Sequence, residues 1–203
     1  MNILIDILPK SVKVDDEEYS INTNFRINMM FELLMQDDSF SQEEKLYMAL
    51  ELYYNKIPDN ITLAVDKMLW FYKCGKEDVE VKQEKDNVEI ETEAEESEDN
   101  KSKIYSFEHD DEYIYSAFLD QYGIDLQDIE NLHWWKFKAL FKGLKEDNLI
   151  FKIMSYRSIK ISNDMSDTDK KYYRKMKEIY ALPDNRTEEE KAKDFDTTLS
   201  TVF

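Results

Sequence analysis

The residues that could do chemistry are few in this chain of 203 residues. His109, Asp110, Asp111 and Glu112 form one run, which is of a type that can hold a metal ion or pair an acid with a base. A metal site needs ligands that converge from several elements, and His133 is the only other histidine. Acidic residues at the start of a helix interact favourably with the positive end of its macrodipole. We therefore interpret the run as a helix start, and we expect no metal, no cofactor and no enzymatic activity.

The single cysteine, Cys74, lies beside Gly75. One cysteine cannot form an internal disulfide, and no base lies near it in the sequence to activate the thiol. Packing at the end of a helix explains it better than nucleophilic catalysis. The chain has only three glycines, and none is paired as a phosphate-binding loop requires.

A second group of residues mixes aromatic rings with cations in the run Trp134-Trp135-Lys136-Phe137-Lys138. Such mixtures occur where proteins stack single-stranded nucleic acid. On a helix, however, one ring can enter the core while its neighbour reaches the edge, so we favour core packing and keep partner contact as the alternative. Nucleic acid is disfavoured, because a net charge of −18 repels phosphate. The candidate contacts with a protein partner are Trp134, Trp135, Lys138, Lys142, Tyr156 and Arg157.

Charge is distributed unevenly along the chain. Residues 76–104 contain 12 acidic and 5 basic residues and few apolar ones, residues 105–132 contain 8 acidic residues and no Lys or Arg, and residues 133–177 contain 12 basic and 5 acidic residues. Residues 76–104 cannot bury enough apolar surface to offset the conformational entropy of folding. We therefore expect a flexible acidic insertion there, followed later in the chain by a basic block.

Apolar spacing predicts a mainly α protein, a helical bundle-like domain with a short N-terminal β-hairpin over residues 11–21. Ser41 and Glu44 form a capping box, as do Thr187 and Glu190 in a short polar helix near the end of the chain. The other expected helices cover residues 24–37, 60–73, 110–121, 127–144, 148–158 and 166–180, and the helix that begins at Ser41 ends before Pro58.

These elements predict four parts of the chain. Residues 1–75 contain the hairpin and three helices, and residues 76–104 are the acidic insertion. Residues 105–182 contain further helices, which we expect to pack with the first part, and residues 183–203 are a polar tail with a short helix. No apolar run approaches the roughly 18 residues of a membrane span, and no signal peptide is visible, so we expect no membrane partner.

Several runs in the second half resemble the bacteriophage gp-fifteen family. The most specific lies within Leu132-His-Trp-Trp-Lys-Phe-Lys-Ala-Leu-Phe-Lys-Gly-Leu. The other runs are Tyr105-Ser-Phe-Glu-His-Asp-Asp-Glu-Tyr-Ile-Tyr-Ser-Ala-Phe, Gln121-Tyr-Gly-Ile-Asp-Leu, Ile153-Met-Ser-Tyr-Arg and, in the first half, Thr23-Asn-Phe-Arg. The resemblance covers roughly residues 10–182, with the acidic insertion as its variable centre.

This resemblance implies a function in tailed phages and prophages. The family is associated with the tail assembly module, near the tape-measure protein. The resemblance therefore implies a tail assembly chaperone that binds the tape-measure or tail tube protein in the host bacterial cytoplasm, with self-association as a further option. The alternatives are a structural tail component retained in the virion and, more remotely, an acidic DNA mimic that inhibits a host protein.

Overall fold

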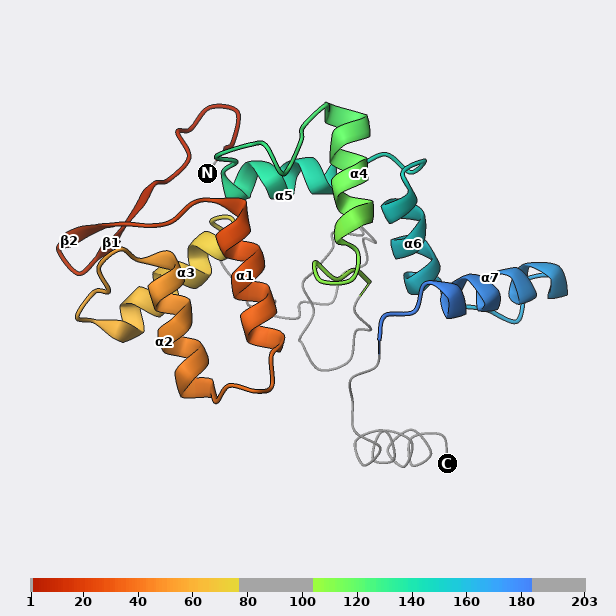
Figure 1. Cartoon of the computed structure of the whole chain (residues 1–203), viewed down its shortest axis with the longest axis horizontal. Helices are drawn as coiled ribbons and strands as arrows, with labels where there is room; N and C mark the ends of the chain where they lie inside the picture. Colours follow the sequence, from red (N-terminus) through yellow and green to blue (C-terminus); the bar gives the residue numbers. More distant parts are fainter. Residues whose placement is uncertain (1, 77–103, 184–203) are drawn as a thin grey trace, which may run out of the picture.

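The computed structural model describes residues 2–76 and 104–183 (Figure 1). The predicted mainly α fold with a short antiparallel hairpin is confirmed. The hairpin strands are β1 (Ser11–Val14) and β2 (Glu17–Ser20). The helices of the described ranges are α1 (Phe25–Gln36), α2 (Gln42–Tyr53), α3 (Ile61–Tyr72), α4 (Asp111–Tyr122), α5 (Trp134–Lys142), α6 (Leu149–Ser158) and α7 (Asp167–Ile179).

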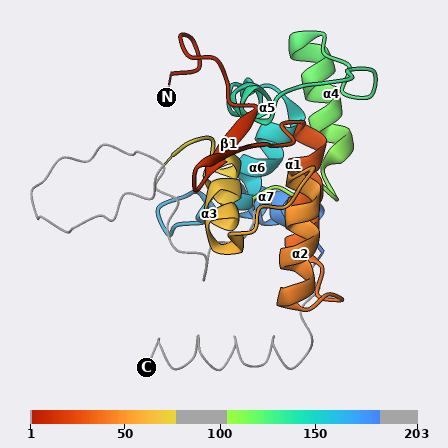
Figure 2. The same cartoon turned by 90° about the vertical axis from the view of Figure 1, so that its left-hand side faces the viewer.

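The hairpin forms where the sequence alternates apolar and polar residues. Ser11 lies opposite Ser20 and Val14 opposite Glu17, and the turn between the strands places Asp15 at a positive φ of 51°. Val12 and Val14 are buried, since one face of β1 packs against α3. Figure 2 shows β1 above α3, and Figure 1 shows α1 beside α2. The hairpin thus gains from a helix the burial that two strands alone lack.

Local capping signals fix where the first helices begin. The side chain of Asn24 accepts a hydrogen bond from the backbone N–H of Arg26 at 3.0 Å, and both hydrogen bonds of the Ser41–Glu44 capping box are present. The predicted cap at Asn60 is also confirmed, because its side-chain oxygen accepts from the N–H of Leu63. Each cap satisfies a backbone donor that the helix itself leaves unpaired.

The helix predicted over residues 127–144 begins later than expected, at Trp134. Two interactions hold the preceding residues in another conformation. The carboxylate of Asp125 accepts from the N–H groups of Gln127 and Asp128, which is a turn that competes with helix formation. The guanidinium of Arg26 binds three carbonyls of this segment, those of Leu126 at 2.6 Å, Ile129 at 3.0 Å and Gln127 at 3.3 Å.

Residues before and after the undescribed segment 77–103 share one hydrophobic cluster. The rings of Phe25 and Phe137 stack at 5.3 Å, which joins α1 to α5. The indole N–H of Trp134 donates to the carbonyl of Tyr72 at 2.9 Å, and that of Trp135 donates to the carbonyl of Phe71 at 2.7 Å. The end of α3 is therefore bound to the start of α5.

Gly75 follows α3 where another side chain would not fit. Its φ is +73°, and a Cβ atom there would lie 2.8 Å from the ring of Trp135 and 3.4 Å from that of Trp70. Cys74 also has a positive φ, and its partly buried side chain packs against the core at the predicted helix end. Gly123 ends α4 in the same left-handed conformation, as expected, but in open space.

Two predictions concern residues outside the described ranges. These are the flexible acidic insertion, apart from its two ends, and the polar tail after residue 183, with its short helix and the capping box of Thr187 and Glu190. No helix of the described ranges is long and apolar enough to cross a bilayer.

Candidate functional site

The two tryptophans that were candidate partner contacts lie in the core. Trp134 is fully buried and Trp135 is 5% exposed, in agreement with the core packing that we favoured from the sequence. The ammonium of Lys138 lies 5.3 Å from the centroid of the Trp134 ring, in a cation–π contact. Lys142 is exposed at the end of α5. The indoles therefore join α5 to α3 and are not displayed to solvent in this structure.

Arg157 is the centre of an internal ion pair. Its two terminal nitrogens bind the two carboxylate oxygens of Asp110 at 2.6 and 2.9 Å, and the side chains are 9% and 1% exposed respectively. The guanidinium also donates to the carbonyls of Ile104 and Tyr180. In such a planar, bidentate arrangement both hydrogen bonds are charge-assisted, and these bonds are roughly twice as strong as those between neutral groups. It places α4, α6 and the residue after α7 in contact.

The ion pair corrects one part of the interpretation of residues 109–112. Asp110 occupies the cap position of α4, and Asp111 and Glu112 lie in its first turn, as predicted. The carboxylate of Asp110, however, makes no capping hydrogen bond, because it accepts from the N–H of Ser106 and from Arg157. Within the described ranges, no three His, Cys, Asp or Glu residues converge in a group that could hold a metal ion.

Tyr156, the remaining candidate contact, belongs to a group of tyrosines that joins α6 to α7. Its ring stacks on that of Tyr180 at 5.9 Å, and its hydroxyl lies 3.0 Å from the hydroxyl of Tyr172. The candidate contacts are therefore not brought together in one site. Arg157 and the tryptophans are used in packing, while Lys142 lies on the surface.

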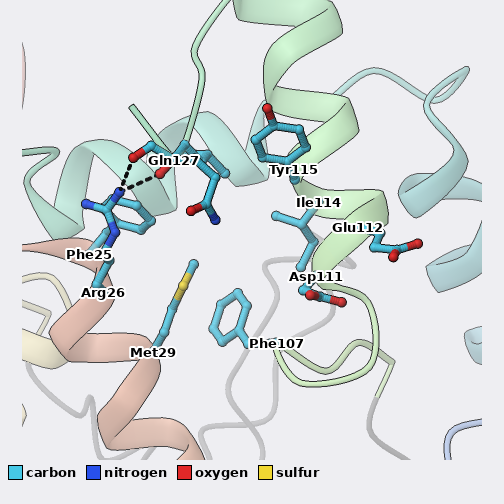
Figure 3. A pocket seen from close by; sticks show the side chains of 10 residues that line it. Phe25, Arg26, Met29, Phe107, Asp111, Glu112, Ile114, Tyr115 and Gln127 are labelled. Carbon is cyan, nitrogen blue, oxygen red and sulfur yellow. Dashed lines mark hydrogen bonds between the residues drawn. The ribbon is translucent and has the colours of Figure 1, made fainter. Parts of the chain in front are cut away.

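A groove of about 350 Å³ opens between α1 and α4, which we call the α1–α4 groove (Figure 3). Figure 3 shows Phe25 and Met29 of α1 facing Ile114 of α4. The apolar side chains that line the groove are Phe25, Met29, Phe107, Ile114 and Leu126, and its acidic ones are Asp111 and Glu112. A concave apolar surface with a few polar groups at its edge is typical of a binding site.

Among the described residues, Arg26 is the only cation that lines the groove, and it already has partners. Arg26 binds the carbonyls of the segment before α5 and lies over the ring of Phe25. The hydroxyl of Tyr115 donates to the carboxylate of Asp125, which raises the pKa of Tyr115. Within the described residues, the carboxylates of Asp111 and Glu112 have no hydrogen bond or ion pair, so the charge that the groove offers to a ligand is negative.

A second candidate site was not foreseen from the sequence. We call the residues Ile3, Leu4, Ile5 and Ile7 the aliphatic arm; their exposed fractions are 44%, 90%, 79% and 90%. A turn closed by hydrogen bonds between Asn2 and Asp6 presents them to solvent. The signal in the sequence was an almost unbroken aliphatic run with no predicted element to bury it.

His133 connects this arm to α5. Its Nδ1 accepts from the N–H of Trp135 at 3.2 Å, which caps α5, and its Nε2 lies 3.0 Å from the carbonyl of Pro9. Because Nδ1 accepts, Nε2 carries the proton and donates to Pro9. Burial lowers the pKa of His133 below its usual value. The neutral imidazole is therefore the form that the fold stabilises.

We expect stability to fall in mild acid through His133. Its pKa is lower in the folded than in the unfolded chain, so the unfolded chain binds more protons as the pH drops below about 6.5. Between about pH 7.5 and about pH 5.5 the melting temperature should decrease, and His133→Asn, which keeps a capping oxygen, should reduce that decrease. The matched control is His109→Asn at the partly exposed second histidine, which should retain it. If the melting temperature decreased equally with pH in both variants, the assignment of this pH dependence to His133 would be contradicted.

Comparison with models of known protein families finds a match. The family model described as "Bacteriophage Gp15 protein" matches residues 4–182. Searches of curated proteins and of solved structures find no match.

Proposed function

This chain belongs to the Bacteriophage Gp15 protein family, and from that membership we propose that it is a phage tail assembly chaperone. It binds the tape-measure protein, or the tail tube protein, during tail morphogenesis in the host cytoplasm. It acts by binding and catalyses no reaction.

The observation that carries this proposal is the aliphatic arm. Single exposed aliphatic residues are common on protein surfaces, but here Leu4, Ile5 and Ile7 are each at least 79% exposed within four positions. Contiguous exposed apolar surface is typical of a site that binds another protein. An assembly chaperone needs such a surface, because a tail protein that has not yet assembled exposes apolar segments of its own.

Co-expression with the tape-measure protein of the same phage tests the proposal. We expect the wild-type chain to keep the tape-measure protein soluble, and the variant Leu4→Ser/Ile5→Ser/Ile7→Ser to lose most of that effect. Its own melting temperature should change little, because the replaced side chains are already in water. The matched control is Leu119→Ser/Leu149→Ser, which replaces aliphatic residues that are 43% and 45% exposed on helices.

Two results would contradict the proposal. The first is a tape-measure or tail tube protein that stays insoluble with the wild-type chain. The second comes from mass spectrometry of purified particles, where a chaperone should be absent although infected lysates contain it. Stoichiometric amounts in clean virions would favour the alternative, a structural tail component.

A further inference from the structure

The surface of α7 combines cations with exposed apolar residues. None of its residues, all of which the structure describes, is buried. From Lys170 to Lys177 it carries five cations and no acid. Tyr172 and Ile179 are 47% and 56% exposed and lie two turns apart on one side, next to Lys171 and Lys175. We call Lys171, Tyr172, Lys175 and Ile179 the α7 stripe.

Three contacts hold α7 away from the α1–α4 groove of its own chain. The ammonium of Lys177 donates to the carbonyl of Arg157 at 2.7 Å, and Arg157 donates to the carbonyl of Tyr180 at 2.6 Å. The hydroxyls of Tyr156 and Tyr172 lie 3.0 Å apart. Figure 1 shows α7 at the right-hand end of the molecule, beyond α6, with α1 on the other side of α4. The stripe can therefore reach such a groove only on another molecule.

The α1–α4 groove is complementary to this stripe in both polarity and charge. Its floor is formed by apolar side chains, and Asp111 and Glu112 stand exposed at its edge. The surrounding residues 105–132 contain eight acids and no Lys or Arg. An amphipathic helix that lays its apolar residues into a groove is a common mode of recognition between proteins.

We propose that the α1–α4 groove binds α7 of a second copy of this chain. Tyr172 and Ile179 lie against the apolar floor, while Lys171 and Lys175 pair with Asp111 and Glu112 at the edge. The two surfaces are different patches of one molecule, so the contact is heterologous and builds a ring or an open chain. This self-association goes beyond the proposed chaperone function. It does not involve the aliphatic arm, and it does not require the tape-measure or tail tube protein.

Sedimentation of the purified full chain tests this contact. At micromolar to millimolar protein in low salt, we expect the average mass to rise with concentration. The association should weaken as the Debye length falls from about 10 Å at 0.1 M to about 3 Å at 1 M salt, because exposed charges contribute to it. A chain that stays monomeric throughout this range at low salt overturns the proposal, and the groove would then be left for a different protein.

Charge reversal identifies the surfaces. Lys171→Glu/Lys175→Glu should weaken association about tenfold or more, because repulsion at the edge replaces attraction. Asp111→Lys/Glu112→Lys should do the same, and an equimolar mixture of the two variants should associate again. The matched control is Lys136→Glu/Lys152→Glu, which changes two exposed lysines outside both surfaces by the same charge. If this control weakens association equally, net charge and not the proposed contact controls it.

A cross-linking measurement tests the same contact without charge reversal, and it leaves the first turn of α4 unchanged. A photoreactive phenylalanine derivative in place of Ile179, which makes none of the three contacts that hold α7, should cross-link between molecules to the peptide that contains Met29, which lines the groove. The cross-linked dimer should disappear at high salt. Intermolecular cross-links that map only to other surfaces would overturn the proposal.

Discussion

Replacing Arg157 with Met should lower the free energy of unfolding by about 3–5 kcal/mol. The substitution leaves the carboxylate of Asp110, which is 1% exposed, without its cation. It also removes the hydrogen bonds to the carbonyls of Ile104 and Tyr180. Urea denaturation followed by circular dichroism measures the loss. Native domains are stable by about 5–15 kcal/mol, so this loss is a large fraction of the total stability.

A double variant separates the two contributions to this loss of stability, the unpaired charge of Asp110 and the lost contacts of Arg157. Asp110→Asn/Arg157→Met has no buried carboxylate, so it should recover a large part of the stability that the single variant loses. The matched control is the exposed pair of Lys13 and Asp16, whose side chains are 67% and 104% exposed. Lys13→Met should cost no more than about 1 kcal/mol. An Arg157→Met cost as small as this control would show that the internal pair contributes little.

Replacing Trp134 with Ala should be about as destabilising, at about 3–5 kcal/mol. The indole is fully buried and stacks on Phe137 and Tyr72 at 5.7 and 5.8 Å. The substitution creates a cavity and also removes the donor to the carbonyl of Tyr72. Because this side chain joins α5 to α3, hydrogen exchange should increase in both of these helices together.

Trp70→Ala is the matched control for this second prediction. Trp70 is a tryptophan of α3 that is only partly buried, with its ring edge against Trp135. The control should cost clearly less, since less of its surface is removed from water by folding. Loss of protection in α5 alone after Trp134→Ala would show that the two halves of the chain open independently.

The helix starts were predictable because capping acts over short distances. Asn24, Ser41 and Asn60 each bond to a backbone N–H two or three residues away, so the sequence contains both partners within one turn. The predicted start of α5 was wrong because the contact that decides it is long-range. Arg26 holds the carbonyl of Ile129 from 103 positions away, and no local pattern records that contact.

The candidate sites were less predictable than the fold. The sequence indicated that Asp110 begins a helix and that Arg157 could meet a partner, but not that they meet each other across 47 positions. For the run at Trp134 the sequence favoured core packing, and both rings are buried, but it did not indicate that they would bond to the end of α3. The α1–α4 groove and the aliphatic arm are consequences of tertiary packing, since they are surfaces that the packed elements leave uncovered.

The contacts at Gly75 and Ile104 have a practical consequence for work in infected cells. Trp135 closes against the backbone of Gly75, and Arg157 holds the carbonyl of Ile104, so the fold fixes the chain on both sides of residues 77–103. Each doubling of a connecting segment costs only about 0.6 kcal/mol in closure entropy. A fluorescent protein inserted after Lys76 would therefore report where this protein is in an infected cell, and would leave the aliphatic arm and α7 unmodified.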